Sequence, residues 1–304
     1  MNGVNARQIV RCGWLGSMLV LLCSTVGMGQ DDLLKELEES QPKQTDYVLA
    51  TFKGTRLVNG HSIETKAGGD LEFIFAHRFG AINRGAYEFF GLDDSYVRIG
   101  LDYGVTERLS ASIGRNSLDK TLDGYLKYKV LRQSTGTTNM PVSVTALGGT
   151  AYRVSPRKSE VPDGFKNIDR LSYVGQLLIA RKFSQRFSFQ LMPTIVHKNA
   201  VDQRLEDNDQ FAIGAGGRFK LTKSVAITGE YYRRLNNPEA NPYFNSLGFG
   251  IDIETGGHVF QLVFTNTRGL TERAFITETE GDFFDGDIHF GFNVTRAFQL
   301  RRKK

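Results

Sequence analysis

Five histidines are the first residues to examine for metal binding or acid–base chemistry. They lie in separate segments, and no two share the i, i+2 or i, i+4 spacing that would bring their rings together on one strand or helix. The five are His61, His77, His197, His258 and His289. We therefore expect no metal site and no cofactor.

Nucleophilic catalysis needs a serine or a carboxylate held beside a histidine. His61 and Ser62 are the nearest such neighbours in the sequence, but adjacent residues of a strand point to opposite faces and cannot form a dyad. The glycine-rich runs at 214–217 and 248–250 open no helix, so they do not form a phosphate-binding loop. The sequence therefore predicts no enzyme activity.

A set of charged residues is the remaining candidate for function, because its members share one face of the strands described below. Around an open pore such side chains would select solutes, whereas in a closed interior they would pair and fill the space. Both signs of charge occur, which favours pairing and a narrow or occluded interior. The candidate interior residues are Glu72, Arg78, Arg98, Asp102, Lys127, Lys129, Arg218, Lys220, Glu230, Asp252, Glu254 and Asp287, together with His289.

The elements that must position these residues are strands. From residue 69 onward, apolar side chains alternate with Gly, Ser, Thr, Gln and charged residues at a period of two. The alternating segments are 71–79, 95–103, 109–113, 122–130, 142–146, 173–179, 187–195, 211–219, 225–231, 247–253, 260–264 and 288–298. These twelve segments predict an all-β, transmembrane antiparallel β-barrel of 12–14 strands, in which lipid-facing residues alternate with interior ones.

The predicted connections alternate in length, as in membrane barrels that have short periplasmic turns and long extracellular loops. The short ones are 104–107, 184–186, 222–224 and 255–257, and the long ones are 80–94, 153–170, 198–208, 235–244 and 267–285. This order places both termini at the periplasmic end. Segments 117–121 and 132–141 do not fit it, because the first is short and the second is long for a tight turn.

A soluble β-sandwich is the alternative fold, since it also shows alternation. Strands of about nine to eleven residues are, however, the length that crosses a bilayer at a tilt. Phenylalanine and tyrosine gather near the strand ends, where they would form interfacial girdles. No later stretch approaches about 18 consecutive apolar residues, so a helical membrane protein is excluded.

The first 29 residues have the order of a cleavable secretory signal. Arg7 and Arg11 precede an apolar run over 14–26, and small residues follow up to Gly29. This run is shorter than a membrane-spanning helix. Four further segments are expected: a short amphipathic helix and linker (30–44), a lead-in strand or plug (45–68), the barrel (69–298) and a basic tail (299–304).

Both cysteines, Cys12 and Cys23, lie in the signal segment, so the mature chain has no thiol. A lipoprotein anchor at Cys23 is a weaker alternative, because bulky Leu22 precedes it. Removal of the two signal arginines lowers the formal net charge from +5 to +3. This balance does not indicate a nucleic-acid partner.

Several runs of the chain resemble an uncharacterised bacterial family, a membrane-bound β-barrel domain of unknown function. The runs are 69–80, 92–95 with 97–100, 216–218, and 252–261 with 265–266. The resemblance covers about 45–298 and implies an outer-membrane barrel with no assigned activity, ligand or catalytic residue. The last strand is also similar to the outer-membrane insertion signal, except that the basic tail continues beyond its final aromatic residue, Phe298.

These observations lead us to expect a narrow pore or a barrel that binds or transports a small solute in the cell outer membrane. Outer-membrane lipid and the barrel-insertion machinery are the expected partners. A structural or accessory barrel without transport is the alternative, and an outer-membrane hydrolase is the third.

Overall fold

The computed structural model describes residues 44–156 and 164–300. Residues Tyr47–Lys304 form one compact unit, and only this unit is described below. Of the preceding unit, only the start of strand β1 (Thr45–Tyr47) is described. The predicted signal peptide, nearly all of segment 30–44 and residues 301–304 of the predicted tail lie outside the described residues.

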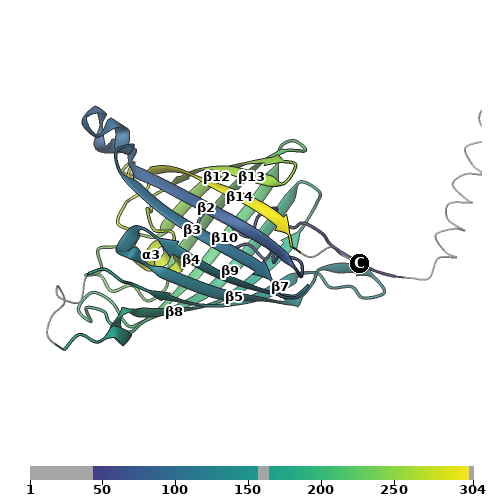
Figure 1. Ribbon diagram of the computed structural model, residues 1–304, viewed down its shortest axis with the longest axis horizontal. Helices are drawn as coiled ribbons and strands as arrows, with labels where there is room; N and C mark the ends of the chain where they lie inside the picture. The colour runs from purple at the N-terminus through teal and green to yellow at the C-terminus, as the bar shows by residue number, and fades with distance from the viewer. Residues whose placement is uncertain (1–43, 157–163, 301–304) are drawn as a thin grey trace, which may run out of the picture. The chain divides into compact units, whose positions relative to one another are not determined.

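Twelve strands form a closed antiparallel barrel, as the alternation predicted (Figure 1). Each strand pairs with the next along the chain, and the last closes on the first through pairs such as Phe298 with Leu71. The strands are β2 (Asp70–Ala81), β3 (Ser95–Gly104), β4 (Leu109–Asn116), β5 (Leu122–Leu131), β7 (Ser143–Tyr152), β8 (Leu171–Lys182), β9 (Phe187–Lys198), β10 (Asp209–Lys220), β11 (Val225–Arg234), β12 (Ser246–Thr255), β13 (His258–Thr265) and β14 (His289–Gln299).

The period-two alternation places apolar side chains on the outer face of the wall and most polar side chains on the inner face. Ile113 and Leu126, for example, are exposed on the outer face, whereas Ser112 and Lys127 beside them are buried inside. An outer face of this kind suits contact with lipid acyl chains. None of the helices in the described ranges is long and apolar enough to cross a membrane.

Connections of different length gather at the two ends of the barrel (Figure 1). At the short-turn end lie 105–108, 183–186, 221–224 and 256–257, together with 132–142, which contains strand β6 (Ser134–Gly136). At the long-loop end lie 82–94, 117–121, 153–156 with 164–170, 199–208, 235–245 and 266–288. Short helices in these loops are η1 (Ile82–Arg84), η2 (Ala86–Gly91), η3 (Leu118–Lys120), η5 (Asn167–Arg170) and α3 (Glu272–Thr277). Which end faces the periplasm stays a prediction.

Residues 51–63, here called the inserted hairpin, enter the barrel from the short-turn end. The backbone N–H of Ser62 donates to the carbonyl of Thr55, and that of Leu57 donates to the carbonyl of Gly60 at 2.8 Å. The tip therefore turns at 57–60 and the chain runs back out to β2. Phe52, Leu57 and Ile63 are at most 2% exposed, so the hairpin fills interior space.

Residues 267–279, here called the inward segment, enter from the long-loop end. All six residues of α3 are buried. Phe275 packs edge-on against Tyr232 of the wall, with 5.3 Å between ring centroids. The interior is thus occupied from both ends.

The inner face is not polar throughout, contrary to the expectation from the sequence. On β8–β11 it carries Leu178, Met192, Val196 and Tyr232, all at most 1% exposed. These side chains form one apolar cluster with residues of the inserted hairpin and with Phe275 and Ile276 of the inward segment. The hairpin is therefore bound partly by burial of apolar surface, as in a soluble core.

Glycine at the hairpin tip is needed for this packing. A Cβ on Gly60 would lie 2.1 Å from the hydroxyl oxygen of Tyr232. Replacing Gly60 with alanine should overpack the site and weaken hairpin seating by about 1–3 kcal/mol, because the tip must shift away from the wall.

Hydrogen–deuterium exchange of 51–63 measures this weakening, while an unboiled gel checks that the barrel still migrates as a folded species. Gly148→Ala is the matched control, since a Cβ there meets nothing within 4 Å. Equal exchange of 51–63 in both variants would contradict the packing argument.

Candidate functional site

A buried carboxylate on the wall holds the tip of the inserted hairpin. Glu230 on β11 accepts hydrogen bonds from three successive backbone N–H groups, those of Val58 (3.1 Å), Asn59 (2.6 Å) and Gly60 (3.1 Å). Such a turn of converging N–H groups is a ready-made anion site. Glu230 therefore serves the tip as a buried hydrogen-bond acceptor rather than lining an open pore.

Cationic side chains of the wall bind the carbonyls and amides of the same hairpin. Arg78 donates to the side-chain oxygen of Asn59 in the hairpin and to that of Asn293 on β14, both at 2.9 Å. Lys127 donates to the carbonyls of Thr55 (2.8 Å) and Ser62 (3.0 Å). The polar groups of the hairpin are thus satisfied from several strands at once, as burial requires.

The inserted hairpin and the inward segment meet at one carboxylate. Glu272, in the first turn of α3, lies 3.1 Å from a guanidinium nitrogen of Arg56 and 2.9 Å from Nε2 of His61. The imidazole also packs edge-on against Tyr125, with 4.3 Å between ring centroids. We call Arg56, His61 and Glu272 the central contact.

Burial sets the protonation of the central contact. Burial, together with the nearby cations Arg56 and Lys127, lowers the pKa of His61 to about 3. Burial opposes ionisation of Glu272, but its contacts with His61 and Arg56 outweigh this effect and lower its pKa. At neutral pH the contact therefore consists of a carboxylate, a guanidinium and a neutral imidazole.

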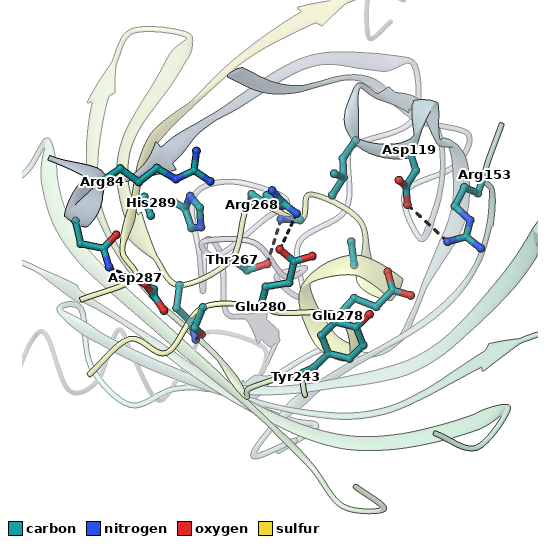
Figure 2. A pocket seen from close by; sticks show the side chains of 17 residues that line it. Arg84, Asp119, Arg153, Tyr243, Thr267, Arg268, Glu278, Glu280, Asp287 and His289 are labelled. Atoms are coloured by element: carbon teal, nitrogen blue, oxygen red, sulfur yellow. Dashed lines mark hydrogen bonds and ion pairs between the residues drawn. The ribbon is translucent and has the colours of Figure 1, made fainter. Parts of the chain in front are cut away.

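Above the inward segment, the barrel opens into a cavity of about 480 Å³ at the long-loop end, here called the mouth cavity. Figure 2 shows Arg268 and Glu280 pointing toward each other near its middle, with a nitrogen–oxygen distance of 2.6 Å. The polar lining comes from Asn83, Arg84, Asp119, Arg153, Tyr243, Asn266, Thr267, Arg268, Glu278, Glu280, Asp287 and His289. Three arginines thus face four carboxylates, so the lining has no strong excess of either sign.

A second cavity of about 350 Å³ adjoins the first and shares Arg153, Tyr243 and Glu278 with it. The buried guanidinium of Arg273 donates to Glu278 (2.5 Å) and to Asp119 (2.8 Å). The bond to Asp119 ties the inward segment to the loop between β4 and β5. The floor of the mouth cavity is therefore continuous with the segment that carries Glu272.

The structure divides eleven of the thirteen charged and histidine residues proposed for the interior into three groups, while the other two, Lys220 and Glu254, lie near the short-turn ends of β10 and β12. Glu72, Arg78, Lys127 and Glu230 bind the hairpin or the segment between it and β2, as when Glu72 accepts from Thr55 at 2.9 Å and from Lys66 at 2.6 Å. Arg98, Asp102, Arg218 and Asp252 are bonded to wall residues, namely Asp123, Tyr125, Glu254 and Gln261.

The last three residues of that set lie at the ends of the barrel. Asp287 and His289 line the mouth cavity, where His289 Nδ1 lies 2.8 Å from the carbonyl oxygen of Phe79. Asp287 precedes β14 and accepts from the side chain of Asn83 at 2.6 Å. Lys129 is half-buried beside a register shift near the short-turn end, apart from the other two groups.

Sequence reasoning missed the central contact. No local pattern marks Arg56 or Glu272, and His61 has neither a second histidine at ligand spacing nor a dyad with Ser62, whose hydroxyl donates to the carbonyl of Gly54 at 2.6 Å. One sequence signal does indicate that the interior is occupied. The period-two alternation places Leu178 and Met192 on the inner face, where they require an apolar partner. No group of three or more potential metal ligands occurs within 44–156 and 164–300.

Acid should loosen the inserted hairpin through His61. When the hairpin is released, the solvated imidazole of His61 has a pKa of about 6.5. Below that pH the released state therefore binds a proton, whereas in the seated state His61 stays neutral down to about pH 3. The equilibrium constant for hairpin seating is therefore largest above pH 6.5 and falls about tenfold per pH unit below it. Between pH 7 and pH 5 it falls roughly 25-fold.

Hydrogen–deuterium exchange of 51–63, corrected for the intrinsic pH dependence, measures this slope. His61→Gln should flatten it, whereas His258→Gln on the wall should leave it unchanged. The same slope in His61→Gln would show that another group is responsible.

Comparisons with known proteins agree with this architecture. The family model described as membrane-bound beta barrel domain (DUF5777) matches residues 52–298. The solved structures that the chain resembles include the NanC porin (10% identity, TM-score 0.46, 76% of this chain and 100% of that one) and the KdgM porin in complex with disordered oligogalacturonate (9%, 0.45, 75% and 99%). A third is Omp33 of Acinetobacter baumannii (8%, 0.42, 76% and 100%).

At such low identities and TM-scores these likenesses say nothing about activity. No curated protein sequence matches the chain. The family match covers most of the chain and all twelve strands of the wall. The chain therefore belongs to the family of membrane-bound β-barrel domains, DUF5777.

Proposed function

We propose that this chain is an outer-membrane barrel that binds a small polar solute in the mouth cavity and lets it pass only when the inserted hairpin moves. The observation that carries the proposal is that the floor of the mouth cavity and the central contact belong to one segment. Thr267, Arg268 and Glu278 line the cavity, while Glu272 between them contacts the hairpin.

The mouth cavity has the features of a site for a hydrophilic solute. Its volume of about 480 Å³ lies within the usual range for small-molecule sites. Arginine, carboxylate, asparagine and threonine groups can hydrogen-bond hydroxyl and amide groups, and Tyr243 offers an aromatic face. Because both charge signs are present, the lining favours neutral or zwitterionic solutes over strongly charged ones.

The central contact supplies a route from binding to passage. A solute that draws Arg268 or Glu280 toward itself pulls on the chain on either side of α3, and displacement of α3 takes Glu272 away from Arg56 and His61. The hairpin then loses its counter-charge at mid-barrel. Passage is thereby coupled to a shift between a seated and a released hairpin.

Removing the carboxylate should favour the released state. Glu272→Ala leaves the Arg56 guanidinium buried without its counter-ion, which costs about 3 kcal/mol or more. In planar bilayers the wild-type protein should open rarely, and Glu272→Ala should raise the open probability at least about tenfold.

The exposed residue Glu239 provides the matched control, because Glu239→Gln removes an equal charge from the loop between β11 and β12, which contributes no residue to the central contact. An unboiled gel establishes that each variant is folded. A folded Glu272→Ala barrel that shows no channel openings would contradict the proposal. It would favour a structural or accessory barrel without transport.

A further inference from the structure

A small basic cavity lies at the other end of the barrel, between the start of the inserted hairpin and the wall. Its volume is about 90 Å³, and its charged lining consists of Lys53, Lys182, Arg186, Arg218, Lys220 and Glu254. Five cations thus converge with one carboxylate. We call this space the basic cavity; it is separate from the mouth cavity and shares no residue with it.

The single carboxylate in the lining, Glu254, already has cationic partners. Glu254 lies 3.2 Å from Nζ of Lys53 and is also paired with Arg218. Lys182 donates to the carbonyl of Leu49 at 3.0 Å. This bond satisfies one N–H donor of the ammonium group but supplies no counter-charge. Arg186 and Lys220 make no side-chain hydrogen bond or ion pair with any residue in 44–156 or 164–300.

The innermost cation is too buried to be balanced by water alone. The side chain of Arg218 is only 9% exposed, and its Nε has no hydrogen-bond partner among the described residues, although Asp252 lies 3.5 Å away. Buried charges normally have full sets of partners. Arg218 pairs with Glu254, which it shares with Lys53, and more distantly with Asp252, and the cavity that it lines carries four further cations.

We propose that the basic cavity is a binding site for an oxyanion group, phosphate or carboxylate, of a soluble molecule. Such a group relieves the repulsion among the cations and accepts charge-assisted hydrogen bonds from them. The cavity can hold a group of several heavy atoms, since one water needs only about 10–15 Å³ by the same measure.

The location decides between a soluble anion and a lipid headgroup as the source of that oxyanion. Ser188 and Arg218, which line the cavity, are buried on the inner face of the wall, whereas Phe187 and Phe219 beside them are exposed on the outer face. Lipid thus lies across the wall from the cavity. The site is open to solutes at the short-turn end and closed to acyl chains.

A bound anion would also act on the inserted hairpin. Lys53 belongs to the hairpin, whereas Arg186 belongs to the turn between β8 and β9 and Lys220 to the end of β10, so one oxyanion bridges the hairpin and the barrel. The bridge holds the hairpin in its seated position. Binding in the basic cavity thus opposes release, and it does so whether or not the mouth cavity binds a solute.

Isothermal titration of the refolded full chain with sodium phosphate, in zwitterionic micelles and at constant ionic strength, tests the site. We expect one saturable site, and slower hydrogen–deuterium exchange of 51–63 when it is filled. Arg186→Gln combined with Lys220→Gln should weaken phosphate binding at least about tenfold, since charge-assisted bonds are lost. Lys223→Gln, which removes a turn lysine outside the cavity, should bind phosphate as the wild type does.

Lys53→Gln provides a second variant, because this side chain is half exposed and its loss leaves the wall intact. It should weaken phosphate binding and remove the effect of phosphate on hairpin exchange. Absence of saturable phosphate binding by the wild type would overturn the proposal. So would cavity variants that bind phosphate as tightly as the wild type does. So would binding that appears only when phosphatidylglycerol is added to the micelles, because the ligand would then be a headgroup.

Discussion

A wall of twelve strands encloses more space than its own side chains can fill, and the rest of the structure depends on this constraint. About eight strands make a barrel that side chains can just pack, while sixteen or more leave a channel. Here the interior is completed by two segments that are not strands of the wall. The wall meets them with Glu230, which binds the backbone of the hairpin tip, and with an apolar seam that buries Leu57 and Phe275.

The two inserted segments account for the otherwise unusual number of buried charges. Arg78, Lys127 and Glu230 are each fully or almost fully buried, which would be costly if they faced one another only across the wall. The hairpin presents carbonyls to the cations and N–H groups to the anion, so its own backbone supplies the partners. Specificity for one seated position follows, because a shift of register would leave several of these groups unpaired.

The wall could be predicted from the sequence because a period of two is a local signal. Each of the twelve alternating segments coincides with a strand, and the parity that placed Glu72 and Arg98 inside agrees with their burial. The occupants of the interior carry no comparable period. The sequence predicts no more than a lead-in strand or a plug for 45–68, which contains the hairpin, and it places Glu272 in the predicted long loop 267–285. Its meeting with His61 spans more than two hundred residues, a separation over which no local pattern carries information.

The position of the inserted hairpin in the chain has a consequence for assembly. It precedes β2, yet many of its partners lie on β9, β11, β13 and β14, as when Gln190 and Asn293 donate to the carbonyls of His61 and Val58. These contacts can form only after most of the wall strands are in place. Because the same strand β14 both closes the barrel on β2 and binds the hairpin, filling of the interior depends on contacts of high contact order, which form late in folding.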